Sequence, residues 1–371
     1  MDSLPKVISE YAPRARGLLP PDVAAYFLGG AGAQTTQSRN RSDLDAIAIR
    51  PRVLKDLRGG HTRLSLMGRQ YAHPILAAPM AYQTLLHPEG EAATAAGVAA
   101  QDGGMVLSAQ AATPLRDVRA VSPACGWFQL YWHVTRDGTL ALAKRAADAG
   151  FEALVFTVDA PVNGVRDGEI SENFKLPPHV RAVNLDGLPQ ARFAPLEASD
   201  SAIFDRLSHV LPSWNDVEWL CQNAPLPVIL KGILTPEDAR LALESGAQGI
   251  IVSNHGGRVL DGAVSAISAL PSIVDVVQQA VPVLMDSGLR RGVDVFRALA
   301  LGADAVLVGQ PIACGLAVGG AQGVSHVLRL LRDELEITMA LAGCKTLDEI
   351  TPDRVVIPSP FSPYCSCSST E

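Results

Sequence analysis

Short apolar runs recur along this chain, and most of them are continuous rather than alternating in polarity. Continuous runs of strand length are typical of parallel strands that are covered on both faces. Helix-like stretches separate the runs, and several end in a glycine that leads into the next run, as in Ala149-Gly150, Ser245-Gly246 and Leu301-Gly302. The predicted strands cover residues 74–79, 104–109, 127–132, 153–158, 227–231, 249–253, 282–286 and 305–309.

Eight alternating β/α units favour a (β/α)8 TIM barrel over a doubly wound sheet. We interpret residues 1–371 as one domain, with a helical extension at about 1–60 and a barrel at about 74–345. A short cap over the barrel floor should precede residue 74, and the tail at about 355–371 is expected to be flexible. The helices that stand out most cover residues 89–101, 138–149, 236–245, 292–301 and 323–340.

One connection, residues 160–212 after the fourth predicted strand, is unusually long and has little periodic pattern. Compact domains avoid structureless loops of this length unless the loop has a role. Because active-site lids of barrels lie at this end of a strand, we interpret the segment as a mobile lid. Partial disorder is the alternative.

Composition and charge exclude several classes of protein. The net charge of −7 argues against a nucleic-acid binder, which would carry a basic face. The first twenty residues do not resemble a signal peptide, and no run of about 18 apolar residues predicts a membrane span, so we expect a cytoplasmic protein. The six scattered cysteines are typical of reduced thiols. Cys365 and Cys367 lack partners for a metal clip, and no metal site is predicted.

The segment Ser253-Asn254-His255-Gly256-Gly257-Arg258 is the most informative stretch, because it directly follows the predicted strand 249–253. A proton acceptor next to a fixed cation suits chemistry on a hydroxyl-bearing carbon that carries a carboxylate. Taken alone, the segment could also be a glycine turn with a capping histidine. Other predicted strands also end in polar groups, which a barrel would gather at one mouth: Gln110, Gln129, Tyr131, Thr157, Asp159, Arg166, Lys231, Asp286 and Arg290.

The last two predicted strands end in glycines, and this predicts a phosphate site. Gly288 and Gly309 would expose backbone N–H groups, and Arg290 adds charge. Tight turns are the alternative for either glycine alone. The cluster Gly29-Gly30-Ala31-Gly32 lacks the spacing of a dinucleotide-binding loop, which disfavours a nicotinamide cofactor. Lys231 could stabilise negative charge on a single-phosphate cofactor, or it could simply reach solvent.

Seven motifs of this chain form a recognisable set: Ala78-Pro79, His87-Pro88-Glu89-Gly90, Gln129-Leu130-Tyr131, Thr157-Val158-Asp159, Leu230-Lys231-Gly232, Ser253-Asn254-His255-Gly256-Gly257-Arg258 and Gly302-Ala303-Asp304. With these motifs the chain resembles, from about Leu18 to Ile350, the FMN-dependent 2-hydroxy-acid oxidase and dehydrogenase family, which includes glycolate, lactate and mandelate-oxidising enzymes.

The resemblance implies a role for each site residue. His255 would be the catalytic base, paired with Asp159. Tyr26 and Tyr131 would hydrogen-bond the substrate, Tyr131 also as a catalytic residue, and Arg166 and Arg258 would hold its carboxylate. Lys231 would lie by the N1–C2=O edge of the flavin. The other implied FMN contacts are Ala78, Ala81, Ser108, Gln129, Thr157, Ser253, Asp286, Gly288, Arg290, Gly309 and Gln310.

The implied reaction is oxidation of an L-2-hydroxy acid, that is an (S)-2-hydroxy acid, to a 2-oxo acid. FMN takes two electrons, and O2 reoxidises the flavin to give hydrogen peroxide. The family also implies a homotetramer. Three alternatives stay open: a dehydrogenase that uses a quinone or another acceptor, an FMN-dependent isomerase, and a non-catalytic flavin-binding barrel.

This chain departs from the family pattern at several positions. Gln310 stands where an arginine is common, which should weaken phosphate binding unless Arg290, Arg291 or backbone groups compensate. The sequence Asp286-Ser287-Gly288 replaces aspartate-glycine-glycine, and a serine fits the middle position if its φ is negative. Glycolate oxidase has a tryptophan in place of Gln110, and arginines are common in place of Val162 and Val165, so substrate choice stays open.

Overall fold

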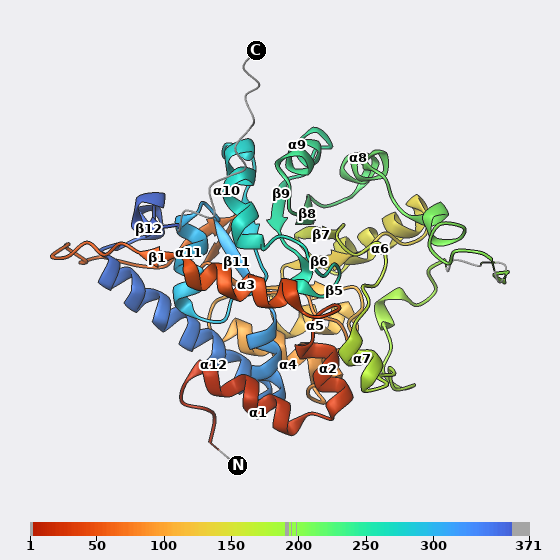
Figure 1. Cartoon of the computed structure of the whole chain (residues 1–371), viewed down its shortest axis with the longest axis horizontal. Helices are drawn as coiled ribbons and strands as arrows, with labels where there is room; N and C mark the ends of the chain where they lie inside the picture. The colour runs from red at the N-terminus through yellow and green to blue at the C-terminus, as the bar shows by residue number, and fades with distance from the viewer. Residues whose placement is uncertain (1–2, 190–192, 194, 198, 358–371) are drawn as a thin grey trace.

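Eight parallel strands close into a barrel in the computed structural model, which describes residues 3–189, 193, 195–197 and 199–357 (Figure 1). Neighbouring strands follow chain order, and β11 pairs with β4 to close the ring. The predicted TIM barrel is therefore confirmed, with every predicted strand present. The strands are β4 (Ile75–Ala77), β5 (Gly104–Ser108), β6 (Trp127–Leu130), β7 (Ala153–Thr157), β8 (Val228–Ile233), β9 (Gly249–Val252), β10 (Val283–Met285) and β11 (Ala305–Val308).

The barrel interior is filled by apolar side chains from its strands, among them Trp127, Ile229 and Leu307. A hairpin of β2 (Leu64–Leu66) and β3 (Arg69–Tyr71) precedes β4. Its residues Leu66 and Tyr71 are buried in the same apolar cluster as the barrel interior. This hairpin is the predicted cap over the floor, and it leaves the opposite, C-terminal end of the strands to carry polar groups.

Helices surround the barrel, and their sequences explain where they begin. Thr135 caps α6, accepting a hydrogen bond from the N–H of Gly138, and Pro236 occupies the first turn of α9. The surrounding helices are α4 (Gly90–Ala99), α5 (Leu115–Val121), α6 (Arg136–Asp148), α8 (Trp214–Asn223), α9 (Pro236–Glu244), α10 (Ala266–Val277), α11 (Gly292–Ala300) and α12 (Gln310–Ala342).

The helix α12 is longer than predicted, because it begins at Gln310 rather than near residue 323. Gly319 and Gly320 interrupt its helical backbone, and this break hides the first segment from a search for helical periodicity. Among the described residues, α12 alone is long and apolar enough to cross a membrane. However, 61% of its most apolar stretch is buried inside the protein, as expected of a core helix.

Three N-terminal helices form the predicted extension: α1 (Tyr11–Leu18), α2 (Pro21–Leu28) and α3 (Thr35–Ala46). The strand β1 (Ala48–Ile49) then pairs antiparallel with β12 (Val355–Val356), so the start of the predicted tail is a paired strand. The rest of that tail from residue 358, with Cys365 and Cys367, lies outside the described residues.

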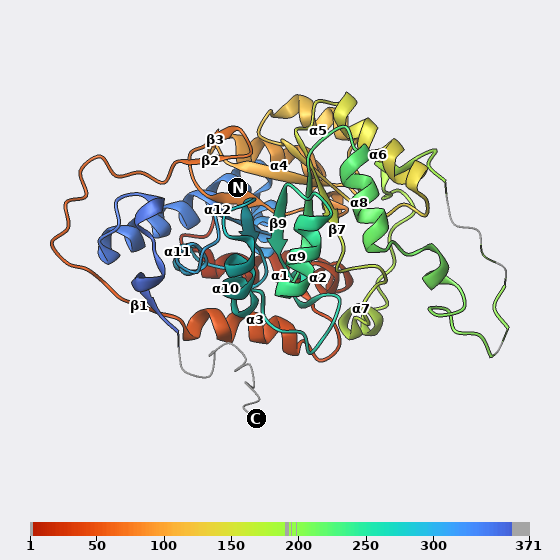
Figure 2. The same ribbon diagram turned by 90° about the horizontal axis from the view of Figure 1, so that it is seen from above.

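The long connection after β7 contains the short helix α7 (Asp167–Ser171) and two 3-10 turns, η3 (Val183–Leu185) and η4 (Leu207–Val210). Figure 2 shows α7 near α2, the described green part of this connection projecting at one side of the molecule, and the loop between β1 and β2 at the opposite side. The buried Asn184 anchors the lid, because its side chain accepts a hydrogen bond from the N–H of Leu115 at 2.8 Å.

Candidate active site

A cavity of about 420 Å³ opens at the C-terminal ends of the barrel strands, within the size range of a cofactor site. The N-terminal helices α2 and α3 and the lid contribute to its wall. Asp159 and Ser253 lie outside the wall, but each contacts a residue that belongs to it. The predicted residues that line the cavity are Tyr26, Ala78, Ala81, Ser108, Gln129, Tyr131, Thr157, Arg166, Lys231, His255, Arg258, Asp286, Gly288, Arg290, Gly309 and Gln310.

His255 is held by Asp159, with 2.9 Å between its Nδ1 and the carboxylate Oδ1. Gly232, in β8, has a φ of +113°, and a Cβ at this position would lie 2.5 Å from the Cβ of Asp159, so a glycine permits the carboxylate to pack there. Burial by itself would raise the pKa of Asp159, but the charges of Lys231 and His255 outweigh it and lower that pKa. Asp159 is therefore a carboxylate at neutral pH.

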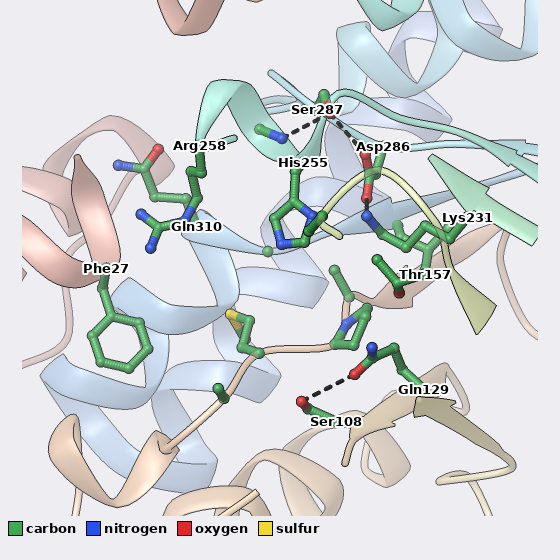
Figure 3. Close-up of a pocket in the computed structure, with 18 of the residues that line it drawn as sticks. Phe27, Ser108, Gln129, Thr157, Lys231, His255, Arg258, Asp286, Ser287 and Gln310 are labelled. Carbon is green, nitrogen blue, oxygen red and sulfur yellow. Dashed lines mark hydrogen bonds and ion pairs between the residues drawn. The ribbon is translucent and has the colours of Figure 1, made fainter. Parts of the chain in front are cut away.

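Lys231 is a buried cation at the end of β8, with a side chain that is 4% exposed. Its Nζ lies 3.1 Å from Oδ2 of Asp286 (Figure 3). The same Nζ donates to Oγ of Ser253 at 2.8 Å. Burial opposes the charge, but the carboxylates of Asp286 and Asp159 outweigh it and raise the pKa of Lys231. Ser253 also accepts a hydrogen bond from the N–H of His255 at 3.0 Å, so it joins the lysine to the histidine loop.

The two arginines meet at one side of the cavity. Nε of Arg166 donates to the carbonyl of Arg258 at 3.0 Å, and Nη1 of Arg258 donates to the carbonyl of Gly29 at 2.7 Å. The guanidinium of Arg258 also lies 5.5 Å from the ring centre of Tyr26, within cation–π range. Burial, together with the charge of Arg166, lowers the pKa of Arg258. The site thus presents two fixed cations, as the resemblance implies.

Sequence reasoning missed Glu169, which interacts with both arginines. Its Oε1 lies 3.0 Å from Nη1 of Arg166 and 3.5 Å from Nη2 of Arg258. The spacing of three residues from Arg166 inside the lid was the one available signal, since such pairs lie on one face of a helix. The contact with Arg258 spans 89 residues of sequence and depends on the fold.

Two tyrosines supply hydroxyl groups to the cavity. Burial raises the pKa of Tyr26 to about 12 and also raises the pKa of Tyr131. Both phenols therefore keep their protons at neutral pH and can donate to an anionic ligand. Phe174, which follows α7, stacks on Tyr26 with 4.6 Å between ring centroids and fixes the ring against the lid.

Side chains of β6 and β7 present polar atoms to the cavity. Oγ of Ser108 donates to Oε1 of Gln129 at 3.1 Å (Figure 3). Nε2 of Gln129 and Oγ1 of Thr157 are buried and have no hydrogen-bond partner among the described residues. Buried polar groups are rarely left unpaired, so these two atoms indicate a ligand that offers hydrogen-bonding groups here.

The predicted phosphate end of the cavity depends on Arg290. Burial, together with the charge of Arg41, lowers its pKa to about 10, which leaves it cationic at neutral pH. Its Nη2 donates to Oε1 of Gln310, so the residue that replaces the expected arginine orients Arg290. Arg291 contributes nothing to the wall, because it pairs with Glu334 at 2.7 Å. Of the two expected compensating arginines, only Arg290 reaches the cavity.

Ser287 occupies the middle position although the condition of a negative φ is not met, because its φ is +76°. Hydrogen bonds stabilise this left-handed conformation. Its Oγ donates to Oδ1 of Asp286 at 2.7 Å (Figure 3). The same Oγ accepts from the N–H groups of Asn254 at 3.2 Å and Gly256 at 3.0 Å. Ser287 thereby connects the aspartate beside Lys231 to the loop that carries His255.

A second missed pair, Asn40 and Asn254, joins α3 to the histidine loop. Nδ2 of Asn40 lies 2.9 Å from Oδ1 of Asn254, and Nδ2 of Asn254 lies 2.7 Å from Oδ1 of Asn40. Both side chains are buried. No local pattern indicates a pair that is 214 residues apart.

Within the described residues, no group of His, Cys, Asp or Glu could hold a metal ion.

Comparisons with known proteins agree on one kind of enzyme. A model of the family "FMN-dependent dehydrogenase" matches residues 15–357. The chain is 50% identical over 352 residues to "L-lactate oxidase" of Roseobacter sp. (strain GAI101), covering 95% of each chain. It is 41% identical over 351 residues to "Glycolate oxidase" of Spinacia oleracea, covering 94% of this chain and 95% of the other.

Solved structures give the same result. A crystal structure of "Mandelate oxidase with benzoyl-formic acid" superposes with a TM-score of 0.85 at 39% sequence identity. The match covers 94% of this chain and 97% of that one.

Proposed function

The chain belongs to the family of FMN-dependent dehydrogenases, and from this premise we propose that it is an L-2-hydroxy-acid oxidase. It would bind FMN, oxidise the hydroxyl-bearing carbon of its substrate to the carbonyl of a 2-oxo acid, and pass the two electrons to O2 to give hydrogen peroxide. The observation that carries the proposal is one cavity in which His255, backed by Asp159, faces the same space as Arg166 and Arg258.

The polar groups of the cavity fit FMN. The unpartnered Nε2 of Gln129 and Oγ1 of Thr157 match the hydrogen-bonding edge of a flavin ring. Arg290 and the N-terminus of α12 at Gln310 favour an anion such as the phosphate. Lys231 would lie at the edge of the ring where negative charge develops on reduction. FMN supplies the acceptor for two electrons when it is bound.

Each side chain of the site has a distinct task in the proposed reaction. Arg166 and Arg258 bind the substrate carboxylate, and a guanidinium pair fixes its orientation as well as its affinity. Tyr131 and Tyr26, which both remain protonated, donate hydrogen bonds to the bound anion. His255 accepts a proton from the substrate, from its hydroxyl or from its α-carbon, and the carboxylate of Asp159 stabilises the imidazolium that forms.

We also propose that the protein is a cytoplasmic homotetramer. Val53 and the fully exposed Leu54 lie in the projecting loop between β1 and β2. The N–H of Arg52 donates to the carbonyl of Ala342 at 3.2 Å, which places this loop beside the exposed Leu341 at the end of α12. Such an exposed apolar surface supports contact with a second copy. The free cysteines among the described residues are compatible with a reducing compartment.

The decisive experiment is anaerobic mixing of the FMN-loaded protein with a panel of L- and D-2-hydroxy acids, with the visible flavin absorbance as the readout. Bleaching by L-acids is expected, and a flavin that no member of the panel bleaches would overturn the proposal. The same panel under air, with peroxide detection, tests the acceptor. Bleaching without peroxide would favour a dehydrogenase with another acceptor.

A further inference from the structure

Glu169 places a carboxylate beside the two cations that would receive the substrate. It lies in α7 of the lid, and it lines the same cavity as His255 and Tyr131. A single oxygen, Oε1, lies 3.0 Å from Nη1 of Arg166 and 3.5 Å from Nη2 of Arg258. Its side chain is 17% exposed, so water screens these contacts only in part.

The remaining hydrogen bonds of the two arginines show why this carboxylate matters. Nε of Arg166 is bonded to the carbonyl of Arg258, and Nη1 of Arg258 is bonded to the carbonyl of Gly29. These bonds fix the guanidiniums close together, where their like charges repel. A carboxylate between them offsets that repulsion while the substrate is absent.

The substrate brings a second carboxylate to the same place. A guanidinium binds any carboxylate by the same geometry, whether it belongs to a side chain or to a ligand. Two carboxylates that share the same donors repel each other, as like charges at one site do. We therefore propose that Glu169 is an internal competitor for the substrate carboxylate, which must displace it from Arg166 and Arg258 in order to bind. The inference rests on the proposed function and names a residue that sets substrate affinity.

The local structure allows Glu169 to leave. The helix α7 has five residues and follows the segment that carries Arg166. Gly168 directly precedes Glu169, and a Cβ there would meet only the Cβ of Ala25, at 3.9 Å, among the described atoms within 4 Å. The space beside Gly168 leaves room for a small shift of α7, and displacement of Glu169 would combine such a shift with rotation of its side chain.

Glu169→Gln tests the proposal, because it removes the charge and keeps the size of the side chain. The probe is a 2-oxo acid product, which does not reduce the flavin. It is titrated into the FMN-loaded protein under nitrogen, and the heat of binding gives its Kd. The variant should bind this probe about tenfold more tightly, with a KM for the hydroxy acid lower by a similar factor. Glu172→Gln, an exposed residue in the same lid segment, is the matched control and should change neither value.

Each other outcome contradicts the proposal. Weaker binding by Glu169→Gln would make Glu169 a support that holds the arginines in place, and unchanged binding would show that it does not compete. Glu169→Ala provides an independent check, since removal of the carboxylate must shift the Kd in the same direction. The proposed function would fail differently, because the wild-type flavin would then stay oxidised with every 2-hydroxy acid.

Discussion

Oδ1 of Asp159 lies 2.9 Å from Nδ1 of His255, and this contact assigns the two imidazole nitrogens different tasks. A carboxylate accepts a hydrogen bond, so Nδ1 carries the proton and Nε2 stays available as the base. Asp159 itself is a carboxylate because the charges around it lower its pKa against the effect of burial. The pair is thus arranged so that Asp159 can stabilise the imidazolium that forms when Nε2 accepts a proton.

Asp159→Asn should slow flavin reduction by roughly a hundredfold or more, within the range of general acid–base effects. The amide has nearly the same shape but cannot stabilise an imidazolium. Stopped-flow absorbance under nitrogen gives the rate directly. Asp167→Asn, an exposed lid residue, is the control. An unchanged reductive rate in Asp159→Asn would remove this residue from the mechanism.

Arg258→Lys should lower kcat/KM by about tenfold to a hundredfold, although the charge is kept. The side chain of a lysine has one nitrogen. It cannot at the same time donate to the carbonyl of Gly29, lie over the ring of Tyr26 and bind a carboxylate. Steady-state kinetics with the best substrate of the panel measures the effect. Arg240→Lys on the surface of α9 should behave as wild type. Full activity in Arg258→Lys would show that charge alone is sufficient there.

Two substitutions at Ser287 should distinguish its effect on the stability of the protein from its effect on the position of the loop that carries His255. Both Ser287→Gly and Ser287→Ala remove the hydroxyl that joins Asp286 to the loop of His255, so both should lower kcat to a similar extent. Alanine also keeps a side chain at a φ of +76°, so it should be less stable than the glycine variant by about 1 kcal/mol. Urea unfolding and steady-state kinetics provide the two readouts. Equal stability, or a normal kcat in both, would contradict this role.

The buried His73, at the barrel floor and away from the candidate active site, should make the stability of the folded protein decrease in acid. Burial lowers its pKa from 6.5 to about 4, so the unfolded chain takes up a proton at a higher pH than the folded protein. The contribution of His73 to the free energy of unfolding is therefore complete above pH 6.5. It is lost as the pH falls from there towards 4.

The free energy of unfolding should decrease between pH 7 and pH 5, and this decrease should be smaller by about 2 kcal/mol in His73→Gln than in the wild type. Urea unfolding at the two pH values measures it, and the exposed His179→Gln should leave the fall unchanged. The same fall in wild type and His73→Gln would assign the acid sensitivity to other groups.

Much of the fold could be read from local pattern. Continuous apolar runs identified every barrel strand, because both faces of a parallel strand are covered and no polar side alternates with the apolar one. The polar residues predicted after these runs line one cavity, apart from Asp159 just behind its wall, since parallel strands of a barrel end at one mouth. The first part of α12 was not predicted, because its glycine break interrupts the helical pattern.

Contacts between distant segments could not be read in this way. The reciprocal amides of Asn40 and Asn254, and the bridge from Glu169 to Arg258, join residues without any shared local signal. The positive φ of Ser287 depends on three hydrogen-bonding partners that the turn sequence does not reveal.

Polarity and spacing along the chain are local properties, and they were enough to predict the barrel, the polar mouth at its strand ends and the chemical types of the side chains there. No local pattern revealed which groups behind the cavity hold those side chains, or which charges face each other across it. Those relationships depend on distances of a few ångströms between residues far apart in the chain, and such distances exist only once the ring of strands has closed.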